Sequence, residues 1–504
     1  MNTISLYQFV DFDFDKFIEK YSYEISEHTV THLTEYARWQ IQKGKIAPDM
    51  VVEIDDGTFS QVSYKAKKGV KDKTKIKWKV QYLQDVIIRR ASSKKHGAFS
   101  LNSQILKAVV GDEYKVMLDI LRNMEYLILG DGRNGQVVNK YYYYEWGGYS
   151  TIYSLPKDKI VEVVDITNIT IQKYLSKEKE KISELRNKYV YPELYSRYGE
   201  NFSVEYEKSL KQIKVRDSKG LNAYIRERIE ENPQSIHYYT YLKNKLSDKN
   251  KIIQRVDNAG RIYHILTNAD RNIKKFLNIE ISADCKNSHP LLLNHFIFRW
   301  HGISLEDSYT ISSAMHRIPE TDIRKNLQTM VTNSLLESLK DDELEYMYLT
   351  SNGMLWDRIM GKHPDIDRNE VKEKMFAEVF YSNETKIRKW QPYATEFNER
   401  FPNVMNLILY WKNSENEHVK TYMDKHNLIS TKPTASLSIS MMNLESRIFG
   451  EILKRIYKKK WKAIHIHDCI IVPETENKKK PTKEDIMNIM KDVYQVCGLH
   501  PTFD

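Results

Sequence analysis

Three segments in the second half of the chain carry residue types that could do chemistry together. In the first, LNIEISADCKNSHP, Ile279 and Ile281 alternate with polar residues, and the alternation ends at Asp284. This is the spacing of a β-strand, and a helix is expected to follow from Asn287 or Ser288. A carboxylate at the end of a strand, facing a cleft, can hold a divalent metal ion, although aspartate at such a place also caps helices.

The second segment, WKAIHIHDCIIVP, predicts a β-hairpin with a polar tip. Apolar, mostly β-branched residues flank His467 and Asp468 on both sides. A carboxylate among such residues is costly to bury unless it is paired or bound to a metal. The alternative is a hairpin tip exposed to water, where the aspartate needs no partner.

The third segment, DRNEVKEKMFAEVFYSN, predicts a helix with an unusual face. Arg368, Lys372, Phe376 and Phe380 recur at every fourth residue. On an α-helix each such step turns by only about 40°, so all four side chains share one face. Such a face can bind an anion at one end and stack a flat base at the other. The alternative is that the cations snorkel beside core phenylalanines.

Taken in order, the three segments resemble motifs A, B and C of the family-A DNA polymerases and the related single-subunit phage-type RNA polymerases. That family has an aspartate at the end of a strand, then an R-x₃-K-x₃-F-x₃-Y-G finger helix, then a histidine–aspartate hairpin. The stretch VDNAGRIYHILTNADRNIKKFL also resembles the family's T-x-x-G-R-L stretch, with Arg261 in the matching place. The resemblance covers roughly residues 255–475.

The chain also departs from the family pattern. The Tyr-Gly of motif B is replaced by Phe-Tyr-Ser at residues 380–382, and Cys469 follows the His-Asp pair. The Asn/Gln-rich stretch before motif C is replaced by SLSISMMNLESRIFGEIL, in which the candidate substitutes are Asn443, Glu445 and Ser446. These differences indicate a distant branch of the superfamily.

The resemblance implies phosphoryl transfer with two Mg²⁺ ions, with Mn²⁺ as a substitute. Because Mg²⁺ prefers oxygen ligands, Asp284, Asp468 and the backbone carbonyl of Cys285 are the expected ligands. Lys372 is expected to contact the triphosphate and to protonate the leaving group, while Arg368 holds the distal phosphate.

The resemblance also implies where the nucleotide and the primer lie. Phe376 and Phe380 are expected to stack near the incoming base. The remaining residues of this set are His467 near the primer terminus, Arg261 along the nascent duplex, and His289 beneath the sugar.

The same positions bear on the choice between deoxyribose and ribose. DNA-synthesising members of the family place a large residue at the position of His289, and RNA-synthesising members place glycine there. RNA-synthesising members also use a tyrosine hydroxyl at the position of Phe380, which has none. Both residues therefore favour dNTPs, but Tyr381 could supply the hydroxyl if the helix shifts by one residue.

These segments need elements to position them, and the resemblance implies an α+β fold with the right-hand polymerase architecture. Palm and fingers would occupy residues 255–504, and the charged helical stretch at 161–254 would be a thumb-like region. Residues 1–160 are expected to form an N-terminal domain with a winged-helix-like module, because three helical patterns and then strands follow one another at 81–155. The run KDKTKIKWK at 71–79 predicts a strand with its lysines on one face, and we expect no proofreading domain.

Composition narrows the class of protein. The chain has 504 residues, a formal net charge of +10 and 34 Tyr, which makes nucleic acid the first partner to test, with a solvated basic surface as the alternative. Its 3 Cys lie far apart, which excludes a disulfide scaffold and a cysteine-based zinc site. The N-terminus lacks the basic region of a signal peptide, and no apolar run approaches the roughly 20 residues of a membrane helix. We therefore expect a cytoplasmic protein without a membrane partner.

The sequence thus predicts a DNA-directed DNA polymerase of a phage or mobile element, without proofreading. Its partners would be a primer–template, DNA rather than RNA, and nucleoside triphosphates. Three other interpretations stay open: an RNA polymerase or primase of the same superfamily, a template-independent nucleotidyltransferase, and a non-catalytic winged-helix DNA-binding replication protein.

Overall fold

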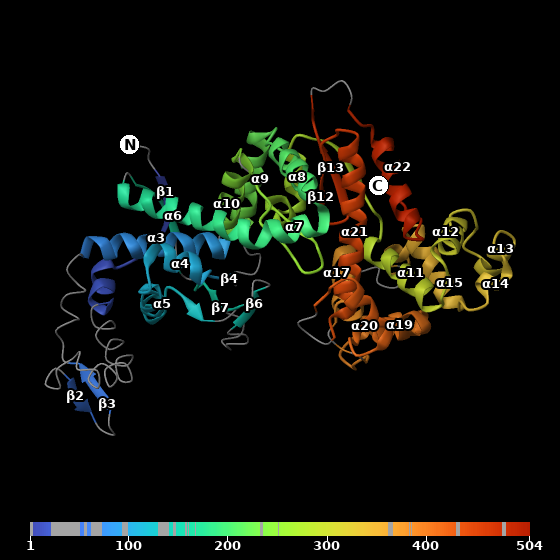
Figure 1. Ribbon diagram of the computed structural model, residues 1–504, viewed down its shortest axis with the longest axis horizontal. Coiled ribbons are helices and arrows are strands. Elements are labelled where there is room, and N and C mark those ends of the chain that lie inside the picture. Colours follow the sequence, from blue (N-terminus) through green and yellow to red (C-terminus); the bar gives the residue numbers. More distant parts are fainter. Residues whose placement is uncertain are drawn as a thin grey trace. The chain divides into compact units, whose positions relative to one another are not determined.

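The computed structural model describes most of the chain as mainly helical, with several small sheets (Figure 1). The described residues are 4–21, 51–54, 58–61, 73–92, 99–129, 141–144, 148–156, 159, 161–166, 168–231, 235–249, 251–360, 366–382, 384, 386–429, 434–475 and 480–504. Among them, no helix is long and apolar enough to cross a membrane.

The chain forms two compact units. The first comprises Met1–Tyr189 and Lys219–Lys245, and the second comprises Val190–Ser218 and Leu246–Asp504. This division differs from the predicted boundaries at residues 160 and 254, because the helical stretch between them belongs partly to each unit.

The helices of that stretch divide according to what they pack against. Helix α6 (Ile169–Leu185) belongs to the first unit, where its buried Glu178 pairs with Arg89 at 2.9 Å. Helix α8 (Glu200–Gln212) belongs to the second unit, where the Tyr206 hydroxyl lies 3.2 Å from His465 Nδ1. The remaining helices of the stretch are α7 (Tyr191–Tyr198), α9 (Ser218–Glu231) and α10 (Ile236–Ser247).

In the first unit, an antiparallel pair of strands packs on a long helix. The strands are β1 (Ile4–Phe9) and β8 (Val161–Ile166), and the helix is α3 (Lys73–Ser92). The side chain of Asp85 on α3 accepts a hydrogen bond from the backbone N–H of Tyr7 at 3.1 Å. A second bond, from the backbone N–H of Phe9 to Gln84 Oε1 at 3.0 Å, also ties the helix to the strand.

The elements that predicted a winged-helix-like module are present in order. After α3 come β4 (Phe99–Ser100), α4 (Ser103–Val110), α5 (Tyr114–Asn123), β5 (Ile128–Leu129), β6 (Tyr141–Tyr144) and β7 (Gly148–Ser154). Strand β7 pairs with β4, β5 and β6. Helix α4 begins after its N-cap Asn102 and ends at Gly111. A further hairpin joins β2 (Val51–Ile54) and β3 (Thr58–Gln61).

The lysine-rich run at 71–79 was predicted to be a strand, and this prediction is wrong for its described part. Lys73 begins helix α3, while residues 71 and 72 lie outside the described residues. Ile76 and Val80 are buried and four residues apart, which is helix spacing. The lysines occupy helix positions other than those of the buried Ile76 and Val80.

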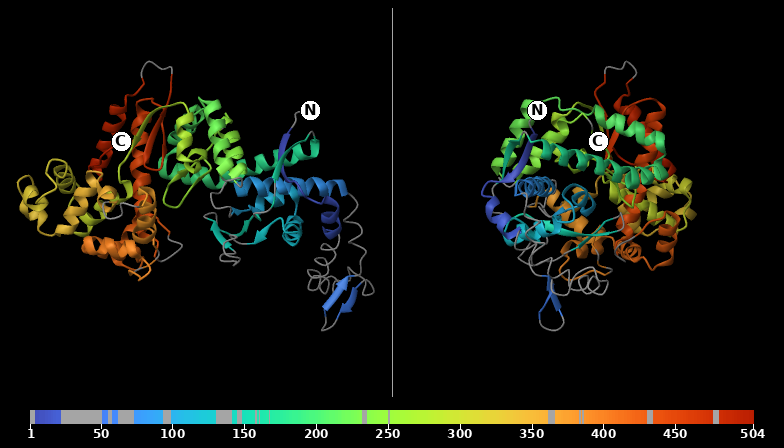
Figure 2. Two further views of the ribbon diagram at one scale, coloured as in Figure 1. Left: turned by 180° about the vertical axis from the view of Figure 1, so that it is seen from behind. Right: turned by 60° about the vertical axis from the view of Figure 1, so that its left-hand side comes forward.

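The second unit is built around an antiparallel sheet of three strands in the order β11-β13-β12. These are β11 (Ile279–Asp284), β12 (Ile464–Ile466) and β13 (Cys469–Pro473). Helix α21 (Ser436–Lys458) packs against β12, and α22 (Lys483–Val496) packs against β11 and α21. Figure 2 shows both helices beside the sheet from further directions.

The predicted strand at 279–284, the hairpin at 467–468 and the helix after Asn287 are all confirmed; that helix is α11 (Ser288–Trp300). The other elements are β9 (Arg255–Val256), β10 (Ile262–Tyr263), α12 (Leu305–Ala314), α13 (Ile323–Gln328), α14 (Asn333–Leu336), α15 (Asp341–Ser351), α16 (Leu355–Met360), α17 (Arg368–Met375), α18 (Pro392–Arg400), α19 (Pro402–Lys412) and α20 (Glu417–Lys425). Short 3₁₀ turns, η4 (Ile265–Asn268) and η5 (Arg271–Phe276), precede β11, and two π-helical turns are η2 (Arg186–Val190) and η6 (Phe376–Phe380).

Candidate active site

Two aspartates that are far apart in the sequence meet at one end of the three-stranded sheet. Asp284, the last residue of β11, pairs in register with Cys469, the first residue of β13. The backbone N–H of Cys285 donates to the carbonyl oxygen of Asp468 at 3.2 Å. The strand pairing therefore fixes the backbones of both aspartates next to each other.

The hairpin between β12 and β13 turns in two residues, His467 and Asp468. His467 has a φ of 53°, in the left-handed region that tight hairpin turns require. Its side chain is exposed, and Nε2 lies 3.3 Å from the carbonyl oxygen of Thr267. His467 is thus at the tip of the hairpin, as the sequence predicted, beside a partly buried Asp468.

The two carboxylates raise each other's energy when both are charged. Burial, and then the neighbouring Asp468, raise the pKa of Asp284 to about 7. Burial, and then Glu445, raise the pKa of Asp468. Lys274 and Lys372 lie close enough to act in the opposite direction on the pKa of Asp284.

This donor set fits a hard divalent cation, because carboxylate oxygens are the ligands that Mg²⁺ prefers and a cation would relieve the repulsion of the pair. Within the described part of the chain, no group of three or more His, Cys, Asp or Glu side chains is placed to hold a metal. The side chains that would hold such a cation are those of Asp284 and Asp468, with the backbone of Cys285 alongside. The Cys285 thiol itself is 2% exposed, and burial raises its pKa.

A buried network lies next to the aspartate pair. Glu445 of α21 is 3% exposed, and its Oε2 accepts hydrogen bonds from Arg261 Nε at 2.8 Å and Nη2 at 2.6 Å. Its Oε1 lies 3.1 Å from His289 Nε2, and His289 Nδ1 lies 2.5 Å from the hydroxyl of Tyr381. Burial alone would raise the pKa of Glu445, but Arg261 and His289 hold it far below its usual range.

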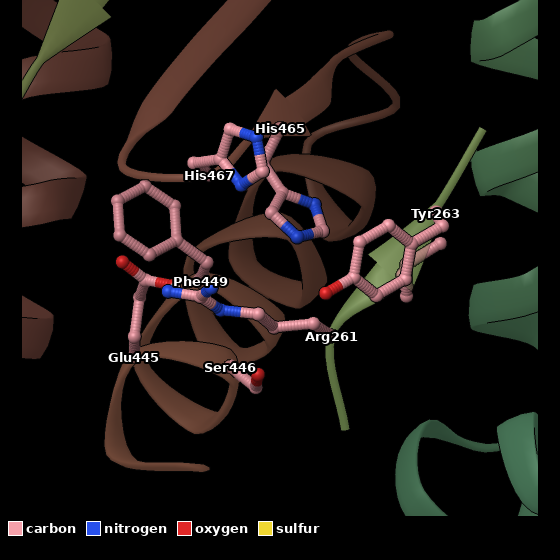
Figure 3. Close-up of a pocket in the computed structure, with 8 residues that line it drawn as sticks. Arg261, Tyr263, Glu445, Ser446, Phe449, His465 and His467 are labelled. Atoms are coloured by element: carbon pink, nitrogen blue, oxygen red, sulfur yellow. Dashed lines mark hydrogen bonds and ion pairs between the residues drawn. The ribbon is translucent and has the colours of Figure 1, made fainter. Parts of the chain in front are cut away.

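The network borders a cavity of about 10 Å³, enough for roughly one water molecule. Figure 3 shows the guanidinium of Arg261 beside the carboxylate of Glu445, with His465 and His467 on the hairpin side. The cavity thus lies between the β10 strand, helix α21 and the hairpin that carries Asp468.

The helix that begins at Arg368 departs from the predicted face after Phe376. Helix α17 passes into the π-helical turn η6, in which the N–H of Tyr381 donates to the carbonyl of Phe376 at 2.8 Å. A π turn contains one residue more than an α turn, so Tyr381 takes the place expected for Phe380. The Tyr381 ring stacks on Phe376 with centroids 5.3 Å apart, whereas Phe380 is 1% exposed and packs against Phe397.

The structure therefore brings together most of the residues that the sequence singled out, namely Asp284, Asp468, His467, Arg261, His289, Lys372, Phe376 and Tyr381. It turns Phe380 into the core instead. Arg368 is the first residue of α17, but its side chain lies outside the described residues.

Sequence reasoning named Glu445 only as a substitute for a family residue and assigned it no partner. A signal was nevertheless available. Met441, Leu444 and Ile448 put Glu445 on the apolar stripe of its helix, and a carboxylate on such a stripe needs a partner. Lys274, which lowers the pKa of Asp284, lies in no sequence pattern that would have singled it out.

No family model matches this chain, and no curated protein matches its sequence.

Proposed function

We propose that this chain is a nucleotidyltransferase that extends a nucleic-acid primer, and specifically a DNA-directed DNA polymerase without proofreading. The observation that carries the proposal is the convergence of Asp284 and Asp468 on adjacent strands, with Lys372 of the motif B helix close enough to act on the pKa of Asp284. The sheet β11-β13-β12 would serve as the palm, and α17 with η6 as part of the fingers.

The residues of the site would divide the work between metal, phosphate and sugar. When bound, divalent ions activate a primer hydroxyl and neutralise leaving pyrophosphate. Asp284 and Asp468 would hold these ions, Mg²⁺ or Mn²⁺. Lys372 and Arg368 would bind the triphosphate, because cations paired with phosphate stabilise the charge that develops on it.

The nucleotide would lie along the stacked rings of Phe376 and Tyr381. His289, held between Glu445 and Tyr381, would close the space beneath the sugar. A bulky wall penalises an additional 2′-hydroxyl, which supports dNTPs as substrates. Base pairing would supply sequence information, so the chain needs mainly backbone contacts to the duplex.

One observation supports a second candidate, an RNA polymerase of the same superfamily. The π turn stacks Tyr381 on Phe376, and in this candidate its hydroxyl would serve as the tyrosine that RNA-synthesising members use. That hydroxyl already lies 2.5 Å from His289, so a ribose would have to compete with the imidazole for it.

The test is an extension assay with purified protein and Mg²⁺. A primed DNA template, a primed RNA template or no template is offered with dNTPs and NTPs separately. We expect extension with primed DNA and dNTPs. Activity without a template, or with NTPs alone, would replace the proposal with the corresponding alternative.

Asp284→Asn and Asp468→Asn keep the side-chain shape but remove a charged ligand. Each should abolish extension and leave DNA binding nearly intact, because binding rests on distributed phosphate contacts. Glu280→Gln is the matched control, since Glu280 lies on the same strand, is exposed and pairs with Lys480. Extension by either Asn variant at the rate of the control would remove the aspartates from the active site.

A further inference from the structure

An exposed tryptophan follows the motif B helix on a short turn. After η6, residues 386–391 lead into helix α18. Trp390 is 66% exposed, more than any other aromatic side chain in the described part of the chain. Exposure of a large apolar ring to water costs free energy, so we looked for a ligand that would cover it.

The turn is anchored by a buried side chain next to the exposed one. Gln391 is 1% exposed, and its Oε1 accepts a hydrogen bond from the backbone N–H of Arg388 at 3.0 Å. Its Nε2 donates to Ser382 Oγ at 3.1 Å and to the carbonyl of Glu378 at 3.3 Å. Trp390 therefore stands on a backbone whose neighbouring polar groups are fixed to the motif B segment.

The start of α18 is fixed to the same segment. The Glu378 carboxylate accepts hydrogen bonds from the backbone N–H groups of Tyr393 at 2.9 Å and Ala394 at 3.2 Å. Pro392, at the first position of the helix, restricts the backbone further. The ring of Trp390 is thus exposed on a preorganised support, which lowers the entropy cost of binding.

Three cationic residues precede Trp390 on the same turn. Lys386, Arg388 and Lys389 are all exposed. Arg388 pairs with Glu384 at 2.6 Å. Among the described residues, the side chains of Lys386 and Lys389 form no hydrogen bond or ion pair, so the turn that carries Trp390 also carries two lysines without an acidic partner in that part of the chain.

We propose that Trp390 is a stacking platform for an unpaired base of single-stranded nucleic acid, with Lys386 and Lys389 contacting the adjoining phosphates. Aromatic rings within basic surfaces bind single strands in this way, because every base has a flat face and every nucleotide a charge. Protein interfaces are instead depleted of lysine around their aromatic anchors, so nucleic acid fits this surface better than a protein partner.

Only the identity of the bound nucleic-acid strand rests on the proposed function. In a primer-extending enzyme, the unpaired strand would be the template that has not yet been copied. Glu378 and Ser382, which hold the turn, flank Phe380 and Tyr381 in the sequence, so the platform is fixed to the segment that would contact the nucleotide.

Binding by the full chain is measured with chelator present and without nucleotides, so that no reaction is needed. The probes are a labelled primer–template with a single-stranded overhang of about ten nucleotides and a blunt duplex of the same paired sequence. Trp390→Ala should weaken binding of the overhang substrate on the order of tenfold and leave binding of the blunt duplex unchanged. Trp390→Phe keeps a ring and should retain most of the affinity.

Trp300→Ala is the matched control, because Trp300 is 45% exposed in the same unit but packs on Tyr410 with ring centroids 4.7 Å apart. It should leave both affinities unchanged. Joint replacement of Lys386 and Lys389 by Ala should lower the salt dependence of overhang binding, by about 0.7 in the log–log slope for each phosphate that the variant no longer neutralises.

Equal losses on the overhang and blunt substrates would overturn the proposal, since they would report a general effect on duplex binding. Unchanged binding of both substrates by Trp390→Ala would also overturn it. If the wild type extends primers but Trp390 has no effect on binding, the platform alone fails. If Trp390 governs overhang binding but no extension occurs, the proposed function alone fails.

Discussion

At the scale of single residues, Glu445 is a buried carboxylate of the candidate site whose charge depends on its partners. Its carboxylate is 3% exposed and is charged only because Arg261 and His289 compensate for its burial. Replacing one partner of a buried ion pair leaves the other charge unpaired in a poor solvent. Arg261 and His289, which the sequence singled out, therefore depend on Glu445 for their place in the site.

Glu445→Gln should destabilise the protein by about 3–5 kcal/mol, the usual cost of leaving a buried charge unpaired, and should reduce extension through displacement of His289. The measurement is the free energy of unfolding in urea. Glu451→Gln on the same helix is the control, because Glu451 pairs with Arg455 in a partly exposed position and should change stability by less than about 1 kcal/mol. Equal stabilities of the two variants would show that the Glu445 pair contributes no net stability.

A second prediction at this scale concerns the choice of sugar. His289→Ala removes the wall beneath the sugar and should lower the ratio of dNTP to NTP incorporation by on the order of tenfold to a hundredfold. Tyr381→Phe keeps the ring and removes only the hydroxyl, so the ratio should persist in this variant. If Tyr381→Phe instead selectively reduces NTP use, and the wild type prefers NTPs, the hydroxyl recognises ribose and the enzyme makes RNA.

At the scale of elements, the π turn η6 explains how an irregular motif can still present a regular face. The family spacing places a tyrosine four residues after the phenylalanine, whereas here Tyr381 follows Phe376 by five. A π turn absorbs one additional residue without rotating the flanking segments. The face is therefore formed by Lys372, Phe376 and Tyr381 together.

Deleting Ala377, an exposed residue of η6, should convert the π turn into an α turn and leave Tyr381 stacked on Phe376. The deletion variant should keep primer extension and its preference for dNTPs. Deleting the exposed Glu373 from the regular helix α17 is the control, since it turns Lys372 by about 100° relative to Phe376 and should abolish extension. Loss of activity in both variants would mean that η6 has a role beyond absorbing the additional residue.

At the scale of the whole molecule, local patterns predicted the strands and helices of the site, while long-range packing determined the rest. The alternation up to Asp284 and the apolar runs around Asp468 each depend on neighbours in sequence, and both elements formed as predicted. No local sequence pattern predicts the π turn at Phe376. The alternating lysines predicted a strand where a helix begins at Lys73.

The division into units could not be predicted from local patterns either. The charged helices between residues 161 and 254 resemble one another in composition, and only their buried partners separate them. Glu178 joins the first unit through Arg89, and Tyr206 joins the second through His465. The architecture of palm, fingers and thumb stays a prediction from the resemblance.

The last prediction joins stability of the molecule to the protonation of its site. Burial lowers the pKa of His264 to about 4 and that of His465 to about 3, from an ordinary 6.5. As the pH falls below 6.5, these histidines bind protons in the unfolded chain but stay neutral in the folded chain. Each of these two histidines therefore lowers the free energy of unfolding on acidification, by about 1.4 kcal/mol per pH unit down to the pKa of that histidine in the folded chain.

Asp284 acts with the opposite sign, because its pKa of about 7 lies above its ordinary 3.8. Between these values the folded chain holds the proton more readily, so acidification stabilises the fold through this group and offsets part of the histidine effect. In chelator, Asp284→Asn should therefore lose stability more steeply than the wild type between pH 6.5 and 4, by about 1.4 kcal/mol per pH unit. Urea unfolding at several pH values measures both slopes, and parallel slopes would show that burial and the neighbouring Asp468 do not raise the pKa of Asp284 in the fold.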